Sequence, residues 1–497
     1  MEVKEKKKWK FKMPTAFTIL FFIIAFLVIM SWILHWSGVT YDGADGATKI
    51  GAMGILDIFW SICQGFVDRA EIIIFILVLG GFIFIVLETK ALEAFTQSVS
   101  KKLGNRSIFL IPIMMFFFSF CGSTYGMAEE TLGFYMILIP LVLSMGYDKF
   151  TGLMIVLFGA GAGVLTSTVN PFVIAVAVDA AKVEGLSSSN GMAWRWISWV
   201  IITGAAITMV TLYAVKVKKN PQKSYTFATL EGDKTFFLGE QQEEVKFTKR
   251  RIATLVIFLM TFVIMVVYLV AWDDITNSTA MGNAGEWVNT NIPYLTALIP
   301  GFGMGYLVEV SVFFFVSALI IALIGWSGEE HYVNAMIDGA RDLLGVCLVI
   351  ATAGGVGIIM DSSGIQSLVV DGLSKGMDGL NSVVFLLLSF IIFLPLSFLI
   401  PSTSGFAAAI FPVWGPLAAS IGTGATGVAS GSILAFSFAS GILNLFTPTS
   451  GVVMGALGIA KMDYGTFMKG SWKFILVMTG TALALLLLGS ALPASVF

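Results

Sequence analysis

The sequence predicts an all-α polytopic membrane protein, built as an inverted repeat with two re-entrant hairpins and two broken transmembrane helices. The first observation is bulk composition: 57% of the 497 residues are apolar, 12% are charged and the mean hydropathy is +0.90, well above the values of soluble domains. The second is a pair of matching breaks: short Ser/Thr/Gly and Asn/Pro stretches interrupt long apolar runs at corresponding places in the two halves. Such breaks survive at membrane depth only where they are buried in protein or line a watery cavity, so they indicate a transport site.

Apolar runs close to the length of a membrane span recur along the chain. Runs at residues 16–32, 72–87, 252–270, 312–324 and 474–488 approach or reach the roughly 20 residues that cross the hydrocarbon core. The first run follows a Lys-rich segment and has no small-residue cleavage site. We therefore expect a retained helix and a cytoplasmic N-terminus.

The first transmembrane half is predicted over residues 1–215. It contains two apolar segments that are short for spans and have cytoplasmic flanks, so they are predicted to form hairpin 1 (108–145). A single crossing over residues 151–181 follows, broken between Thr166 and Pro171. The proline can begin the second half-helix, because the first turn of a helix needs no hydrogen bond from that nitrogen.

The second half is predicted to repeat this order upside down. A cytoplasmic connecting loop (216–251), then a connecting helix with an external loop (252–305), lead into the inverted half (306–497). That half carries hairpin 2 (383–417) and a second broken helix (427–460). An inverted repeat brings matched breaks to face one another, so one shared cavity is expected.

The candidate binding residues gather at the hairpin tips and helix breaks. Half-helix N-termini offer free N–H groups to anions, and carbonyls at C-terminal ends favour cations. The candidate substrate-binding residues are Ser123, Thr124, Gly126, Glu129, Glu130, Ser167, Thr168, Asn170, Ser402, Thr403, Ser404, Asn444, Thr447, Thr449 and Ser450. The alternative for the small residues is that they only pack helices closely.

Glu129 and Glu130 stand out among these candidates. They lie at hairpin depth, where an ionised carboxylate costs a few kcal/mol unless it is paired or hydrated. The matching tract of the second half, residues 406–409, carries no charge, so the acidic pair is expected to serve a ligand or coupling. Its partner would be a bound cation or a proton. Alternatively, one glutamate caps a half-helix or reaches Arg69, which the pattern otherwise places at the membrane interface with Asp68.

Other classes of function lack their sequence signatures. The chain has no Walker sequence, no GxGxxG before a helix of a soluble domain and no HExxH, so ATP-driven transport and zinc proteolysis are not expected. A net charge of −2 without a basic domain argues against a nucleic-acid partner. His35 and His331 lie near span ends and do not suit an enzyme, and a channel would not need two inverted hairpins. No cofactor and no metal site is expected.

Four motifs in order resemble the YfcC-like family, which is grouped with the anaerobic C4-dicarboxylate carriers in the ion transporter superfamily. They are GSTYGMAEET, STVNPF, PSTSG and LNLFTPTSGVVMG, beginning at Gly122, Ser167, Pro401 and Leu443. The resemblance covers nearly the whole chain. It implies a secondary carrier of elevator type in the bacterial cytoplasmic membrane, a homodimer in which a mobile part of each protomer carries both hairpins and both broken helices.

The resemblance leaves two classes of substrate, and charge favours one of them. The family includes arginine/ornithine exchangers, and its name also points to dicarboxylates. A dicarboxylate would meet Glu129 and Glu130 with no basic residue in the motifs, which is unfavourable at low dielectric. We therefore expect a secondary transporter of a basic amino acid, exchanging arginine and ornithine. The alternative is Na⁺- or H⁺-coupled uptake of C4-dicarboxylates or other small organic anions, with either glutamate as the proton site.

Overall fold

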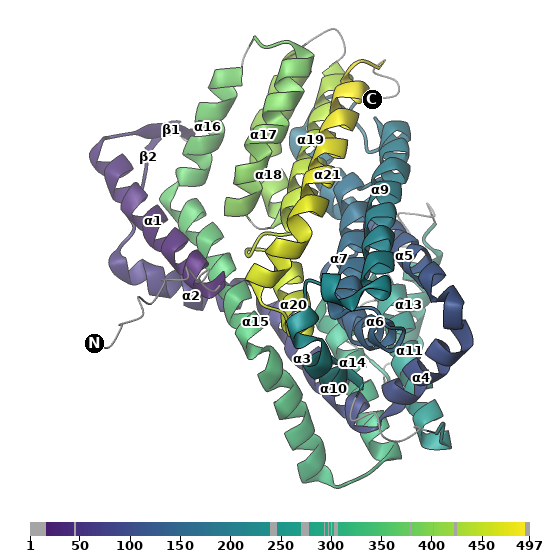
Figure 1. Ribbon diagram of the computed structural model, residues 1–497. Helices are drawn as coiled ribbons and strands as arrows, with labels where there is room; N and C mark the ends of the chain where they lie inside the picture. The colour runs from purple at the N-terminus through teal and green to yellow at the C-terminus, as the bar shows by residue number, and fades with distance from the viewer. Residues whose placement is uncertain are drawn as a thin grey trace, which may run out of the picture.

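The structure is a computed structural model that describes residues 16–43, 46–238, 246–269, 278–292, 294–296, 298–299, 301–302, 307–377, 379–400, 402–421 and 425–492. It is nearly all helical (Figure 1). Ten helices of this described part are long and apolar enough to span a membrane. A helix satisfies its backbone hydrogen bonds internally, as hydrocarbon requires, so the predicted all-α polytopic class is confirmed. The basic N-terminal segment and Pro401 lie outside the described residues.

A small β-hairpin is the exception to the helical fold. After α1 (Ala16–Trp36), β1 (Thr40–Gly43) pairs antiparallel with β2 (Gly46–Lys49), with Tyr41 opposite Thr48. The sequence analysis predicts no strands here. Aromatic and β-branched residues favour such pairing once the chain turns back on itself.

Two helical segments from different halves pack antiparallel. The pair α2 (Ile55–Asp68) and α3 (Ala70–Glu88) runs along the single long helix α15 (Glu329–Ser363). Their backbones approach so closely that a Cβ on Gly65 would lie 2.0 Å from the Ala351 carbonyl oxygen. Small residues permit this approach between membrane helices. In Figure 1, α15 lies between α1 and α2 on one side and the yellow helices α20 and α21 on the other.

Hairpin 1 and the first broken helix follow α4 (Ala91–Leu103) in the chain. The arms of the hairpin are α5 (Leu110–Tyr125) and α6 (Leu132–Ser144), joined through the short turn η2 (Glu129–Thr131). The broken helix consists of α7 (Lys149–Thr166), η3 (Pro171–Ala175) and α8 (Val176–Ala181). Both arms pack against α7.

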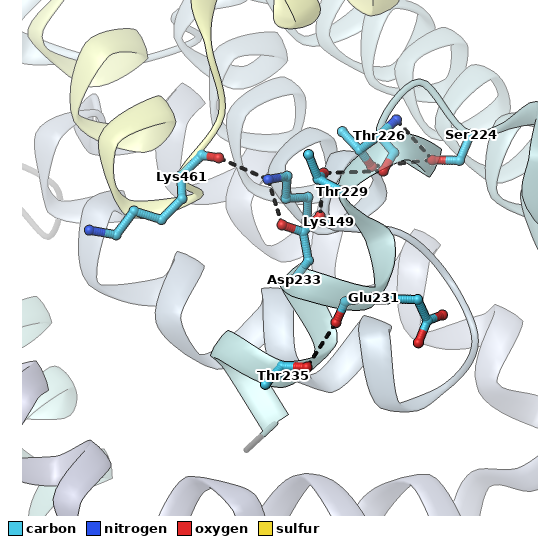
Figure 2. A network of polar contacts seen from close by, with 8 residues as sticks. All are labelled: Lys149, Ser224, Thr226, Thr229, Glu231, Asp233, Thr235 and Lys461. Atoms are coloured by element: carbon cyan, nitrogen blue, oxygen red, sulfur yellow. Dashed lines mark hydrogen bonds and ion pairs between the residues drawn. The ribbon is translucent and has the colours of Figure 1, made fainter. Parts of the chain in front are cut away.

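The connecting loop begins later than predicted and is fastened to the membrane part. Helix α9 (Met192–Lys219) extends into the predicted loop, and α10 (Leu230–Leu238) lies within it. The Lys149 ammonium donates to the Asp233 carboxylate and to the Lys461 carbonyl, each at 2.8 Å (Figure 2). Through these contacts the loop joins the start of the first broken helix to the end of the second.

The second half repeats the first in order. It follows α11 (Lys249–Leu269) and α13 (Ala280–Asn291) and begins with α14 (Leu307–Ile324). After α15 and α16 (Ile365–Met377), α17 (Ser382–Leu399) and α18 (Thr403–Ser420) form hairpin 2. Helices α19 (Ala425–Asn444) and α20 (Gly451–Ile459) form the broken helix, and α21 (Tyr464–Ser490) ends the described fold.

The two broken helices lie against each other where each one breaks. The Ser437 hydroxyl of α19 donates to the Leu165 carbonyl of α7 at 2.9 Å. A Cβ on Gly441 would lie 2.4 Å from the Leu165 Cα. This contact places the two breaks side by side, with the tips of both hairpins around them.

Candidate functional site

A cavity of about 180 Å³ lies where the two hairpin tips meet the two breaks. Hairpin 1 contributes its tip, hairpin 2 the start of α18, and the two broken helices their interrupted ends. The predicted binding residues that line this central cavity are Gly126, Glu129, Glu130, Asn170, Ser402, Thr403, Ser404, Asn444 and Ser450. The matched asparagines of the two halves therefore share one cavity.

The tip of hairpin 1 rests directly on the first break. Gly126 has a positive φ of 80°, and a Cβ there would lie 2.7 Å from the Asn170 side-chain oxygen. Any larger residue would displace the asparagine, and glycine also suits the left-handed backbone. The Asn170 amide donates to the Ser167 hydroxyl at 3.1 Å, and its oxygen accepts from the Phe172 N–H at 3.0 Å. Asn170 thus holds the start of the second half-helix while it faces the cavity.

Hydrogen bonds from residues that do not line the cavity hold the first break in place. The Ser123 hydroxyl donates to the Thr168 hydroxyl at 2.9 Å, and the Thr168 N–H donates back to Ser123 at 3.1 Å. The buried Arg195 donates from Nε to the Thr168 carbonyl at 3.0 Å. The sequence analysis does not single out Arg195, although a charged residue beginning an apolar run is itself a signal.

The two glutamates have different surroundings. Glu130 is buried, and its carboxylate accepts the Ala128 N–H at 2.8 Å, so it closes the turn of its own hairpin. Glu129 lines the cavity and is only partly covered. Across the described residues, no side chain forms an ion pair or hydrogen bond with its carboxylate. Glu129 is therefore the acidic group that is left for a ligand.

Arg69 also lines this cavity, instead of lying only at the interface as the sequence pattern suggests. It sits between α2 and α3, where its Nε is 3.1 Å from an Asp68 carboxylate oxygen. Its positive charge acts on Glu129 through space. The charged groups at this cavity are thus an acidic pair from hairpin 1 and one guanidinium from outside the motifs.

The second half presents helix N-termini without any charged side chain. Ser402 caps α18, its hydroxyl accepting the Gly405 N–H at 3.2 Å, and Ser450 caps α20, accepting from the Val453 N–H at 3.4 Å. The Asn444 amide donates to the Thr403 hydroxyl at 3.1 Å. Free N–H groups and the helix dipole make such ends suitable for a carboxylate.

Several predicted site residues are not part of the cavity lining. Each forms hydrogen bonds within the protein, and they are Ser123, Thr124, Ser167, Thr168, Thr447 and Thr449. The Thr447 and Thr449 hydroxyls, for example, bond to each other at 2.7 Å. These side chains shape the breaks from the protein side.

The cavity therefore combines charged groups, Glu129 and Arg69 among them, with uncharged hydrogen-bonding groups. Glu129 offers a negative charge, whereas α18 and α20 offer N–H groups, hydroxyls and the Asn444 amide. Within the chain as described, no cluster of three or more His, Cys, Asp or Glu side chains could hold a metal ion. Such an arrangement suits a small organic molecule that carries both a cation and a carboxylate.

Comparison with known proteins identifies the family. The model for the C4-dicarboxylate anaerobic carrier family (DcuC) matches residues 13–490. A Haemophilus influenzae protein named "Uncharacterized protein" is 26% identical, covering 98% of this chain and 97% of its own. The Escherichia coli protein named "Putative basic amino acid antiporter YfcC" is 27% identical, covering 80% of this chain and 73% of its own.

Two solved membrane transporters match over most of their length. The YdaH transporter of Alcanivorax borkumensis has a TM-score of 0.45 at 13% identity and covers 97% of this chain and 100% of its own. The efflux pump MtrF of Neisseria gonorrhoeae has a TM-score of 0.43 at 15% identity and covers 96% of this chain and 95% of its own. The family match, which extends over nearly all the sequence, decides the assignment: this chain belongs to the C4-dicarboxylate anaerobic carrier family of membrane transporters.

Proposed function

We propose that this transporter exchanges basic amino acids, arginine for ornithine, by an elevator-type alternating-access mechanism. The observation that carries the proposal is the Glu129 carboxylate, which faces the central cavity without a side-chain partner in the described structure. An ionised carboxylate at membrane depth is unfavourable unless it is paired or hydrated. A guanidinium or ammonium group of the substrate would form the ion pair that Glu129 lacks. The name of the Escherichia coli relative supports the same class of substrate.

The substrate's carboxylate would bind to the uncharged groups of the same cavity. Free N–H groups at the starts of α18 and α20, with the Thr403 hydroxyl and the Asn444 amide, can hydrogen bond to it. Hydrogen bonds to charged groups are worth roughly 1.5 to 3 kcal/mol each. Together with Glu129, these groups would select an amino acid with a basic side chain over one with a neutral side chain.

The proposed movement is based on the two matching halves of the fold. Both hairpins and both broken helices would move together, while α2, α3 and α15 would belong to the part that stays fixed. The protein would work as a homodimer in the lipid of the bacterial cytoplasmic membrane, with its N-terminus in the cytoplasm. Exchange of two cations of similar charge would need no bound Na⁺ and no coupled proton.

Arg69 favours a second candidate function. A guanidinium in the cavity, together with two helix N-termini, could hold the two carboxylates of a C4-dicarboxylate, the substrate class in the family's description. Such a carrier would be coupled to Na⁺ or H⁺, and Glu129 or Glu130 would take up the proton. Protonation would remove the repulsion that otherwise opposes a dianion.

Counterflow in proteoliposomes separates these two functions. Liposomes loaded with unlabelled substrate are offered labelled arginine or labelled succinate, with wild type, Glu129→Gln, Arg69→Gln and Glu231→Gln. The exposed Glu231 lies outside the cavity, so its variant controls for general loss of charge. We expect arginine to exchange in wild type and Glu231→Gln but not in Glu129→Gln. Succinate uptake that follows a pH or Na⁺ gradient and depends on Arg69 would instead support the dicarboxylate carrier.

A further inference from the structure

A second and larger cavity, of about 550 Å³, lies away from the central one. It is lined by the end of α3, the start of α11, the end of α14 and the start of α15, and the two cavities share no lining residue. None of the four motifs of the sequence analysis reaches it. Its lining therefore calls for an explanation other than substrate binding.

The charges around this second cavity favour an anion. Four acidic, basic or imidazole side chains line it: Arg250, Arg251, Glu88 and His331. The Glu88 carboxylate lies within hydrogen-bond distance of the His331 imidazole, at 3.0 Å, and the two arginines outnumber this one carboxylate. Arg250 has no hydrogen bond or ion pair within the described structure, so its full charge is available.

Arg251 contributes less free charge than its neighbour. Its Nε donates to the Thr89 carbonyl at 3.1 Å and its Nη1 to the Lys246 carbonyl at 2.8 Å. Glu93 on α4 also attracts it. Arg251 therefore holds the wall of the cavity in place, and Arg250 remains the principal counter-charge.

The cavity also contains an unsatisfied donor. The Tyr332 hydroxyl oxygen is buried and has no hydrogen-bond partner among the described residues. Leaving a buried polar group unpaired costs roughly as much as losing a hydrogen bond. An acceptor oxygen inside the cavity would satisfy it.

The apolar surroundings point to a lipid instead of a free anion. Ile321, Ala322 and Ile324 line the cavity, and the neighbouring Leu323 is 56% exposed. Trp326, which lines the mouth, is 53% exposed, and tryptophan favours the level of lipid headgroups. We propose that this cavity binds the phosphate of an anionic phospholipid through Arg250 and Tyr332, with the acyl chains on the exposed apolar face of α14.

Lipid titration of the purified protein, followed by native mass spectrometry, tests this site. Phosphatidylglycerol and phosphatidylcholine are compared for wild type, Arg250→Gln, Tyr332→Phe and the control Lys223→Gln. Lys223 is an exposed basic residue of the connecting loop outside the cavity. Arg250→Gln should weaken phosphatidylglycerol binding roughly fivefold, Tyr332→Phe should weaken it less, and neither should change phosphatidylcholine binding or arginine counterflow.

Three results would overturn the proposal. Equal losses in Arg250→Gln and Lys223→Gln would mean general attraction of anionic lipid to a basic surface. Displacement of phosphatidylglycerol by millimolar inorganic phosphate would mean a site for the free anion. Lipid binding by monomers that disappears in dimers would mean that a second copy of the chain covers this cavity. None of these outcomes bears on the central cavity, so the transport proposal stands or falls separately.

Discussion

The buried ion pair between Lys149 and Asp233 predicts a large loss of stability in Asp233→Asn. Their side chains are 3% and 9% exposed, and the Asp233 carboxylate also accepts the Thr229 hydroxyl at 2.8 Å (Figure 2). Asparagine keeps the shape but leaves the Lys149 charge buried without its counter-charge. Breaking a buried pair by removing one partner costs about 3 to 5 kcal/mol.

A neighbouring exposed pair supplies the control for this experiment. Lys234 and Glu231 lie 2.9 Å apart, with side chains 33% and 86% exposed, and exposed pairs of this kind contribute about 0 to 1 kcal/mol. Unfolding of the purified protein in detergent should therefore require less heat or denaturant for Asp233→Asn than for wild type, and should hardly change for Glu231→Gln. If the two variants unfold alike, the connecting loop is not held by this pair and the reasoning fails.

Three further predictions concern packing and the central cavity. Gly163→Ala places a Cβ 2.0 Å from the Ser119 carbonyl oxygen and should lower the free energy of unfolding by about 1 to 3 kcal/mol. A Cβ on Gly204 would meet no atom within 4 Å, so Gly204→Ala should not destabilise the protein. Thermal unfolding of the two variants and wild type checks this prediction. Asn444→Ala should weaken arginine binding to the purified protein roughly two- to tenfold through one lost hydrogen bond, and unchanged affinity would remove Asn444 from the site. Glu130→Gln keeps a carbonyl oxygen for the Ala128 N–H, so its counterflow should fall less than that of Glu129→Gln; an equal loss would contradict the different roles of the two glutamates.

Local sequence patterns predict most of the helices, because hydropathy and helix breakers act over short distances. The predicted hairpin 2 (383–417) contains the turn between α17 and α18, and the break predicted between Thr166 and Pro171 follows the end of α7. The connecting loop is less well predicted. Its helix α10 depends on a contact with Lys149, far away in the sequence, that no local pattern carries.

The central cavity is predictable only in part, for the same reason. The breaks in the apolar runs are visible in the sequence, so they identify residues such as Asn170 and Asn444. Arg69 lies between α2 and α3 and Arg195 on α9. Arg69 reaches the cavity and Arg195 the first break only in the folded chain. Composition also cannot separate hydroxyls that face the cavity, such as Thr403, from those turned into the protein, such as Thr447.

Binding of arginine and citrulline to wild type and Glu129→Gln tests whether Glu129 recognises the positive charge of the substrate. Citrulline has nearly the shape of arginine but a neutral side chain, so comparing the two ligands measures the effect of the ligand's positive charge. Comparing wild type with Glu129→Gln measures the effect of the protein's negative charge. Wild type should bind arginine roughly tenfold to a hundredfold more tightly, as one charged hydrogen bond implies, and Glu129→Gln should bind both weakly and alike. Equal binding of the two ligands by wild type, or a preference for arginine that persists in Glu129→Gln, would contradict the account.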